Sequence, residues 1–416
     1  MRDLLPEESL RQARLARAVM ESFELVGYER VTLPVFEYAD VFADGMGELN
    51  GVVRFVEPES GDIVALRPDM TPQIARLVSA RYSDAPMPVR LCYQGNVVRR
   101  RHQRARQAKQ ILQAGLELVG PSGAEGDFEV IAAAVAAVQT TGLTQFAVDI
   151  GNAQISASLL DGVEASVRAA IVDALSLKDA AELRWAAERA GLSKKVLGAV
   201  LALPELHGDG EVWARADRAF AGTPAENPAN ELRAVWELLD KAGLPGKRLL
   251  DLGETWRFPY YSGMVFQILA DGPGEAVGGG GRYDGLFGRY GLPAAAAGFA
   301  LDLTNLGLAL AADQLSAARH RVLVVAGATE TARVEPLLGQ IRAAGLASAA
   351  GAVQGATEYA AIWRYSHIVE LTAAGATINT LGAELASNAV VKLTQTDDSL
   401  GAGLIKALTD ATEKDG

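Results

Sequence analysis

Two pairs of polar side chains have the types and spacing that suit the binding of a small nitrogen-containing ligand. Asp69 and Thr71 lie where a predicted strand meets a predicted helix, and their oxygens could either cap the helix or bind an ammonium group. Gln113 and Glu117 are four residues apart on a predicted strand, so both side chains lie on one face. Because a polar pair in an apolar strand costs free energy unless it is hydrogen-bonded, this pair is either a buried structural pair or a contact for an ammonium or an imidazole.

Three further segments could contribute to a binding site. The run from Arg99 to Lys109 lies between two predicted strands, and its guanidinium groups match the geometry of phosphates and carboxylates, although a solvated charged loop has the same composition. Tyr260 and Tyr261 either line a pocket or pack in a sheet with exposed hydroxyls. The glycine run 278–281 permits close approach of the backbone to a ligand, but it lacks the Lys-Ser/Thr that a phosphate-binding P-loop requires.

The composition excludes several classes of protein. The 416 residues include 39 Lys and Arg against 51 Asp and Glu, and the net charge of -12 disfavours non-specific nucleic-acid binding. The single cysteine, Cys92, rules out an intrachain disulfide framework and a cysteine-rich zinc site, and the four histidines have no metal-ligand spacing. The charged N-terminus lacks an apolar signal core, and no apolar run is long enough for a membrane span. We therefore expect a cytoplasmic protein with neither a metal nor a cofactor.

The order of predicted elements indicates an α+β fold rather than a doubly wound parallel sheet. An amphipathic helix is predicted from Pro6 to Gly27, with an apolar face formed by Leu15, Val19, Phe23 and Val26. Pro34 marks the strand from Tyr28 to Glu37 as an edge strand, because proline donates no hydrogen bond to a ladder. The next predicted elements are a hairpin (52–56 and 63–67), a helix (71–82), two strands (89–98 and 110–119), a helix (127–139) and a strand (146–150).

The patterning divides the chain into a core, 1–315, and a small α/β domain, 320–416. Residues from about 155 to 244 are rich in Ala, Leu, Glu and Arg and predict a helical insertion in the core. Strands are predicted at 248–252 and 260–269, followed by a glycine-rich turn and a helix from about Phe299 to Leu315. Alternating predicted strands and helices after Arg321 indicate the second domain.

Four segments together resemble the class II aminoacyl-tRNA synthetases, specifically the histidyl-tRNA synthetase lineage. Residues 27–37 resemble the dimer-forming motif 1, and residues 91–99 followed by 113–117 resemble motif 2. Residues 280–286 resemble a histidine-binding signature, and residues 298–301 resemble the start of motif 3. The resemblance covers about residues 1–310 and implies a class II synthetase-like antiparallel sheet with flanking helices, while residues 320–416 loosely resemble the anticodon-binding domain.

The resemblance also implies a histidine pocket on matching positions. Asp69 and Thr71 match the positions that hold the α-amino group, and Arg99 matches the motif 2 arginine that faces the carboxylate and the nucleotide phosphate. Gln113 and Glu117 match the positions that contact the amino group and the imidazole side of the ligand. Tyr261 and Tyr283 match the tyrosines around the imidazole ring. The predicted histidine-binding residues are therefore Asp69, Thr71, Arg99, Gln113, Glu117, Tyr260, Tyr261, Arg282 and Tyr283.

Three departures affect the positions that bind ATP in the family. The motif 3 arginine is replaced by Asn305, the motif 2 glutamate by Arg101, and the catalytic arginine by Trp256, with Arg257 one residue out of register. Losing these charges removes most of the electrostatic stabilisation that adenylate formation needs, because an amide cannot replace a bidentate guanidinium on a phosphate. A retained amino-acid pocket without ATP-binding groups is typical of a non-catalytic relative.

This combination resembles the regulatory subunits of ATP phosphoribosyltransferase, which bind histidine and assemble with the short catalytic subunit of that enzyme. The resemblance predicts a non-catalytic chain that binds L-histidine for feedback control of the first step of histidine biosynthesis, as a homodimer within a hetero-oligomer. Two alternatives stay open. One is a divergent histidyl-tRNA synthetase, favoured by the C-terminal domain and the basic loop; the other is a histidine-binding relative with another partner. The acidic net charge argues against a nucleic-acid partner.

Overall fold

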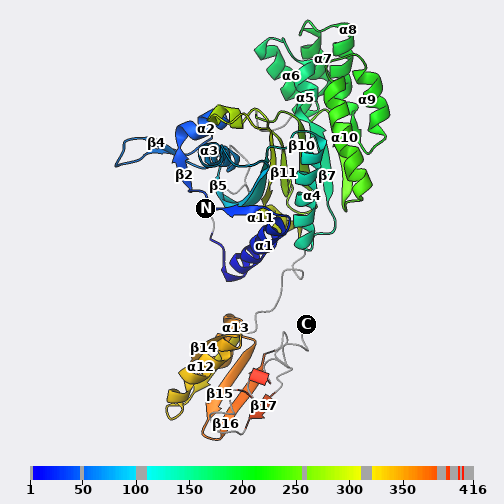
Figure 1. The fold of residues 1–416 in the computed structure, drawn as a ribbon. Coiled ribbons are helices and arrows are strands. Elements are labelled where there is room, and N and C mark those ends of the chain that lie inside the picture. The colour runs from blue at the N-terminus through cyan, green and yellow to red at the C-terminus, as the bar shows by residue number, and fades with distance from the viewer. Residues whose placement is uncertain are drawn as a thin grey trace. The chain divides into compact units, whose positions relative to one another are not determined.

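The computed structural model describes residues 3–46, 51–99, 110–254, 260–310, 321–381, 390–393, 402 and 405–406. The chain divides into two compact units, residues 1–315 and 316–416. The larger unit contains helices α1 to α11 and the smaller one contains α12 and α13 (Figure 1).

A nine-stranded sheet forms the centre of the larger unit, with the strand order β1-β5-β6-β12-β11-β10-β7-β9-β8. Its described pairs are antiparallel apart from β1–β5 and β7–β9. This arrangement confirms the predicted α+β class with an antiparallel core. The strands are β1 (Glu29–Val31), β5 (Val89–Val98), β6 (Gln110–Val119), β12 (Ala296–Asp302), β11 (Gly278–Arg282), β10 (Met264–Leu269), β7 (Ala147–Asn152), β9 (Lys247–Asp251) and β8 (His207–Gly208).

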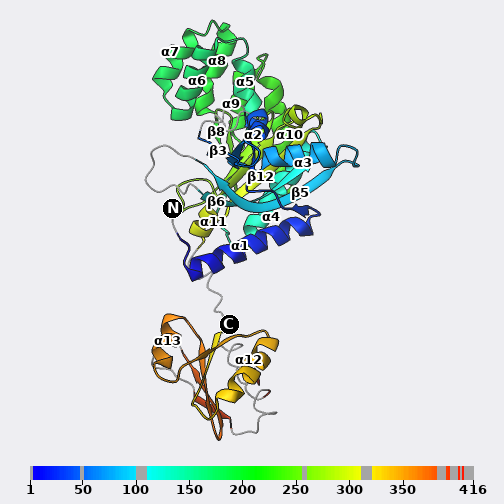
Figure 2. The ribbon, with the colours of Figure 1, turned by 90° about the vertical axis from the view of Figure 1, so that its left-hand side faces the viewer.

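Helices pack on one face of this sheet and bury its larger core (Figure 2). Phe23, on the predicted apolar face of the first helix, is fully buried and meets Phe299 edge to face, with ring centroids 5.5 Å apart. Val26, predicted for the same face, is 49% exposed, because the helix has ended and the chain turns at Gly27, whose φ is +89°. The helices of this layer are α1 (Pro6–Leu25), α4 (Ala124–Thr140) and α11 (Leu303–Ala309).

The opposite face carries a smaller layer. Alternate residues of β5 separate the two cores, since Cys92 joins the core with α1 and α4 whereas Leu91 and Tyr93 join the core with α3. The predicted hairpin forms, and the strand predicted from Tyr28 to Glu37 divides around Pro34 into β1, at the edge of the large sheet, and β2. This layer consists of α2 (Ala39–Met46), α3 (Thr71–Arg81), the 3₁₀ helix η2 (Phe287–Tyr290) and the sheet β2 (Phe36–Tyr38), β4 (Ile63–Leu66) and β3 (Arg54–Val56).

A buried arginine fixes the segment that leads into α3. Arg67 is 4% exposed, and its guanidinium donates to the carbonyls of Leu33, Pro34 and Asn96 at 2.9, 3.2 and 2.6 Å. Gly95 leaves room for this group, because a Cβ at that position would collide with the guanidinium. The start of α3 is thereby held against β5.

Six α-helices, together with the 3₁₀ helix η1 and strand β8, lie between β7 and β9 in the stretch expected to be a helical insertion. Asp179 and Ser193 cap two of them by accepting hydrogen bonds from backbone N–H groups, and Gly243, with φ +60°, ends the last. The elements are α5 (Ala153–Leu159), α6 (Ala165–Leu177), α7 (Ala180–Glu188), α8 (Lys194–Ala202), η1 (Leu203–Glu205), α9 (Val212–Phe220) and α10 (Glu226–Ala242).

Two predictions in the third quarter of the chain are wrong. The glycine run 278–281 forms strand β11 rather than a turn, and the helix predicted from Phe299 begins only at Leu303, because 296–302 is strand β12. The glycines are required by packing, since a Cβ on Gly280 would collide with the carbonyl of Gly298 on the neighbouring strand. Burial between neighbouring strands therefore overrides the local preferences of a glycine- and alanine-rich sequence.

The C-terminal unit has a five-stranded sheet with the order β14-β13-β15-β16-β17. Strand β13 is parallel to β14 and β15, and the other described pairs are antiparallel. The sequence pattern predicts strands at 322–325, 368–371 and 390–393, which match β13, β15 and β17, but it predicts neither β14 nor β16. The elements are β13 (Arg321–Ala326), η3 (Thr331–Arg333), α12 (Val334–Ala343), β14 (Ala347–Gly351), α13 (Ala356–Ile362), β15 (His367–Thr372), β16 (Gly375–Thr380) and β17 (Val390–Leu393).

None of the helices in the described parts of the chain combines the length and the apolar character that a membrane span requires.

Candidate ligand-binding site

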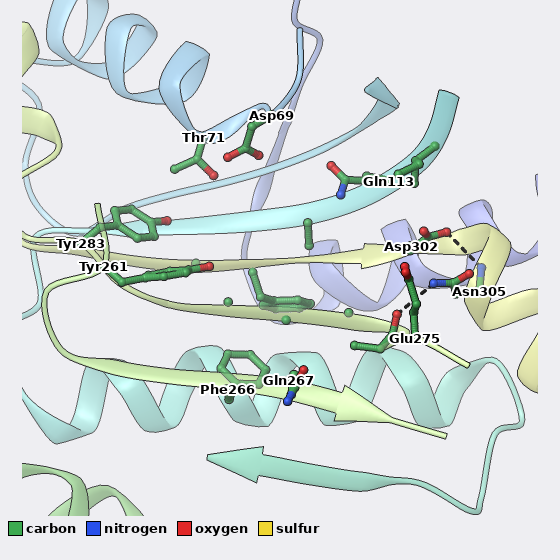
Figure 3. Close-up of a pocket in the computed structure, with 18 of the residues that line it drawn as sticks. Asp69, Thr71, Gln113, Tyr261, Phe266, Gln267, Glu275, Tyr283, Asp302 and Asn305 are labelled. Atoms are coloured by element: carbon green, nitrogen blue, oxygen red, sulfur yellow. Dashed lines mark hydrogen bonds between the residues drawn. The ribbon is translucent and has the colours of Figure 1, made fainter. Parts of the chain in front are cut away.

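A cavity of about 590 Å³ lies over the centre of the large sheet, under the start of α3. The backbone of Gly278, Gly279 and Gly280 forms part of its wall. In Figure 3, Tyr261 and Tyr283 lie toward one end of the cavity. Glu275, Asp302 and Asn305 lie toward the other end. A cavity of this size takes a drug-sized ligand, which is larger than a single amino acid.

Asp69 and Thr71 point into the cavity from the start of α3 (Figure 3). The N-cap residue of α3 is Met70, and no side chain caps the helix there. One carboxylate oxygen of Asp69 accepts from the Met70 N–H at 2.8 Å, and the other accepts from the Tyr260 hydroxyl at 2.7 Å. The Nε of Arg99 donates to the Pro68 carbonyl at 2.7 Å. This loop is therefore tied to the cavity wall on both sides.

Glu117 lies at the tyrosine end, below Thr71, and is 1% exposed. Its Oε1 accepts from the Thr71 hydroxyl at 2.7 Å and from the Tyr93 hydroxyl at 3.0 Å. Its Oε2 has no hydrogen-bond partner among the described residues. Burial raises the pKa of Glu117 to about 8, and the charge of Asp69 adds to this rise, whereas the bonds from Thr71 and Tyr93 oppose it.

Gly298 creates the space beside this carboxyl group. A Cβ on Gly298 would collide with Oε2 of Glu117 and with the hydroxyl of Tyr283. The Tyr283 hydroxyl is buried and, within the described parts of the chain, also has no hydrogen-bond partner. Glu117 Oε2 and the Tyr283 hydroxyl, both without partners among the described residues, therefore lie next to Gly298. Since buried polar atoms are nearly always hydrogen-bonded, these two atoms are candidate contacts for a bound ligand.

Three tyrosines close this end of the cavity. Tyr260 lies 5.1 Å from Tyr261 and 5.7 Å from Tyr283 between ring centroids, in edge-to-face contact. Burial raises the pKa of Tyr260 and of Tyr261, so both hydroxyls stay protonated at neutral pH. On the adjoining wall, Gln113 is 7% exposed, and its Oε1 lacks a partner among the residues described.

The structure brings most of the predicted histidine-binding residues together around this cavity, and Glu117 adjoins it through Thr71. Arg282 is placed differently. Its guanidinium pairs with Asp127 at 2.7 Å and with Asp284 at 2.9 Å, and it donates to the carbonyls of Pro121 and Gly123. The side chain therefore joins β11 to the start of α4 rather than lining the cavity. The predicted residues that line it are Asp69, Thr71, Arg99, Gln113, Tyr260, Tyr261 and Tyr283.

The other end of the cavity contains Asn305, at the position where the resemblance to the synthetases implies an arginine. Its amide Nδ2 donates to the Ala276 carbonyl at 3.0 Å, and its backbone N–H donates to Asp302, which caps α11. Glu254 and Glu275 also line this end. Burial, with the nearby charge of Asp251, raises the pKa of Glu254.

Arg101, Trp256 and Arg257, the other positions of interest for ATP binding, lie outside the described residues. So does the basic segment 100–109. Within the part of the chain that the structure describes, no group of His, Cys, Asp or Glu side chains has a geometry that could hold a metal ion.

The sequence pattern indicates Glu117 but not the residues that support its carboxyl group. Tyr93 and Gly298 both contact its carboxyl group or keep space for it, yet neither carries a local signal in the sequence. Their importance follows from strand register, which pairs Tyr93 with Gly115 on β6 and Gly298 with Glu117 across β12 and β6.

Comparison with known proteins identifies the family. Residues 1–306 match the family model described as histidyl-tRNA synthetase. The ATP phosphoribosyltransferase regulatory subunit of Syntrophotalea carbinolica is 36% identical over 314 residues, which cover 74% of this chain and 73% of that protein. The protein of the same description from Anaeromyxobacter sp. strain Fw109-5 is 42% identical over 73% of this chain and 89% of its own length.

The chain belongs to the family of ATP phosphoribosyltransferase regulatory subunits. This confirms the resemblance seen in the sequence. The relatives are described as regulatory subunits rather than catalytic subunits. A solved structure from Bacillus halodurans, described as an ATP phosphoribosyltransferase regulatory subunit/histidyl-tRNA synthetase, has a TM-score of 0.77 and 27% identity, covering 89% of this chain and 96% of that one. The histidyl-tRNA synthetase of S. aureus, at 19% identity and a TM-score of 0.66, shares the fold and covers 96% of this chain.

Glu117→Gln tests the burial of the carboxyl group in this regulatory-subunit fold. Folding raises the pKa from 4.5 to about 8, so the folded chain binds the extra proton and wild-type stability falls as pH rises through that window. The amide has no such linkage. We predict that the free energy of unfolding of the variant, relative to wild type, rises with pH by up to about 1.4 kcal/mol per pH unit. Urea denaturation between about pH 5 and about pH 8 measures this difference, and a difference that does not change with pH would contradict the raised pKa.

Proposed function

We propose that this regulatory subunit binds L-histidine in the cavity and assembles, in the cytoplasm, with the short catalytic subunit of ATP phosphoribosyltransferase. Histidine then controls the first step of histidine biosynthesis through the assembly. The observation that carries the proposal is the pair of buried atoms without partners among the described residues, Glu117 Oε2 and Tyr283 Oη, beside an acidic anchor at Asp69.

The chemistry of L-histidine fits these groups one by one. The carboxylate of Asp69 suits the α-ammonium group, and Arg99 on the cavity wall suits the α-carboxylate. An imidazole has one ring N–H and one ring nitrogen acceptor. The ring N–H can donate to Glu117 Oε2, which supplies the partner that this buried atom lacks.

The end of the cavity that contains Asn305 supports a non-catalytic role, because its described residues lack the groups that would bind ATP. The Asn305 amide donates to a backbone carbonyl, so it offers no guanidinium for a phosphate. The carboxylates of Glu254, Glu275 and Asp302 line the same end, and like charges disfavour an anionic polyphosphate there. The observation argues against the alternative that this chain is a histidyl-tRNA synthetase.

The small sheet β2–β4–β3 supports the proposed homodimer within a hetero-oligomer. Its strand β2 overlaps the end of the segment 27–37, which resembles motif 1. The sheet and the residue before it also carry exposed apolar side chains. Phe36 and Phe55 meet edge to face with ring centroids 6.1 Å apart, and exposed apolar side chains that gather in this way are typical of a protein interface. The exposed residues are Val35, Phe36, Tyr38, Phe55, Val56 and Ile63.

Feedback requires that L-histidine bind two states of the assembly with different affinity, and its effect cannot exceed that difference. The cavity joins strands at the sheet centre to α3 and, through Ser176 at its edge, to the helical insertion. L-Histidine at the tyrosine end would contact the start of α3 and the strands of the sheet centre, which gives it a means of favouring one arrangement of these two parts.

Calorimetry with two ligands on one sample tests the binding proposal. We predict that L-histidine binds and that ATP produces no binding heat. Glu117→Ala should weaken L-histidine binding by about tenfold or more, because the buried hydrogen-bond acceptor for the ring N–H is lost. Glu182→Ala, at an exposed position of α7, serves as the control and should bind as wild type does. Robust histidine-dependent ATP–pyrophosphate exchange by the purified chain would contradict the proposal.

Co-expression tests the proposed partner. We predict that a short-form ATP phosphoribosyltransferase catalytic subunit co-purifies with this chain and is active only in the complex. The control is the same catalytic subunit expressed alone. If histidine binds to this chain but the catalytic subunit neither co-purifies nor gains activity, the chain regulates a different partner.

A further inference from the structure

Tyr93 reaches Glu117 by crossing a glycine. It pairs with Gly115 in the ladder between β5 and β6, and Gly115 and Glu117 lie on the same face of β6. A Cβ on Gly115 would lie 2.7 Å from the Tyr93 hydroxyl and 2.8 Å from its ring, so any larger residue would displace the tyrosine. The ring therefore passes over Gly115, and its hydroxyl donates to Glu117 at 3.0 Å.

Both donors to Glu117 act on the same oxygen. The hydroxyls of Thr71 and Tyr93 approach Oε1 from α3 and from β5, respectively. Two donors from separate elements fix the rotation of the carboxyl group, because turning it would break both bonds. Oε2 is then held toward the space that Gly298 leaves open, next to the Tyr283 hydroxyl.

We propose that Tyr93 is a positioning residue of the ligand site: by engaging Oε1 together with Thr71, it presents Oε2 of Glu117 to a ring N–H of the ligand. The inference rests on the proposed function for the identity of that ligand, L-histidine. Tyr93 itself is 1% exposed and does not line the cavity, so it acts through Glu117 rather than by touching the ligand.

The position of Tyr93 also affects the proton on Glu117. Burial raises the pKa of Tyr93 far above its ordinary value, so the hydroxyl remains a donor. A hydrogen bond to the carboxylate favours its charged form, so removing the hydroxyl should raise the pKa of Glu117 above about 8. The other titratable groups facing this site stay in place in such a variant. They are Asp69 before α3, Tyr260 and Tyr261 before β10, Tyr283 after β11 and Arg99 after β5.

Tyr93→Phe in the full chain tests this role, and Tyr28→Phe is a matched control. Tyr28 is also buried, and its hydroxyl donates to a different glutamate, Glu129, at 2.9 Å. Both variants lose one tyrosine–glutamate hydrogen bond, but only Tyr93→Phe acts on Glu117. The measurements are the pKa of the Glu117 carboxyl carbon by ¹³C NMR without ligand and the dissociation constant for L-histidine by calorimetry.

We expect Tyr93→Phe to raise the pKa of Glu117 by about one unit. If binding requires the carboxylate, that shift weakens L-histidine binding about tenfold at about pH 6.5 but only about threefold at about pH 8.5, where more of the variant is ionised. Tyr28→Phe should change neither quantity. Thr71→Val removes the other donor and should also raise the pKa, whereas Thr71→Ser keeps the hydroxyl and should restore it.

Two results would overturn the positioning role: an unchanged Glu117 pKa in Tyr93→Phe, or an equal loss of affinity in Tyr28→Phe. If Tyr93→Phe does not fold, Thr71→Val and Thr71→Ser decide the question by the same two measurements. A raised Glu117 pKa in a chain whose wild-type form does not bind L-histidine would uphold the role of Tyr93 on the carboxyl group and overturn the proposed function.

Discussion

The carboxyl group of Glu117 is buried, and burial of an ionisable group costs free energy unless hydrogen bonds and neighbouring groups compensate. The hydroxyls of Thr71 and Tyr93 both donate to one oxygen of Glu117. Gly115 and Gly298 have no Cβ, which leaves room for the Tyr93 ring and for the Glu117 carboxyl group, respectively. The start of α3, the ladder of β5 with β6 and the glycines of the sheet centre are therefore constrained by one residue. Its second oxygen, without a partner among the described residues, is what makes the site suited to a ligand.

The parts of the fold with a clear local pattern could be predicted from the sequence. Strands β5 and β6 match their predicted bounds, because apolar residues recur through 89–98 and 110–119 on either side of a polar, basic sequence. Strands β11 and β12 could not be predicted in this way. Their glycines and alanines favour a turn or a helix locally, and only packing between neighbouring strands, where a Cβ on Gly280 would collide, explains their extended form.

Site residues could be predicted from the sequence where a polar side chain interrupts an otherwise apolar strand. Gln113 and Glu117 were identified because polar side chains are costly in an apolar strand. Arg282 has the same residue type as a ligand contact, yet its guanidinium is held by Asp127, and a sequence does not show which way a side chain points. At the other end of the cavity, the resemblance implies that Asn305 replaces an arginine of the synthetases, whereas only the structure shows its bond to Ala276.

L-Histidine is expected to act on the catalytic partner through Glu117, and inhibition of the assembled enzyme tests this most directly. The experiment titrates L-histidine into complexes of the short catalytic subunit with the wild-type chain or with Glu117→Ala, and measures phosphoribosyl transfer to ATP. Histidine should inhibit the wild-type complex, while the Glu117→Ala complex should stay active over the same range. Equal inhibition of both complexes would show that histidine acts elsewhere than at this cavity.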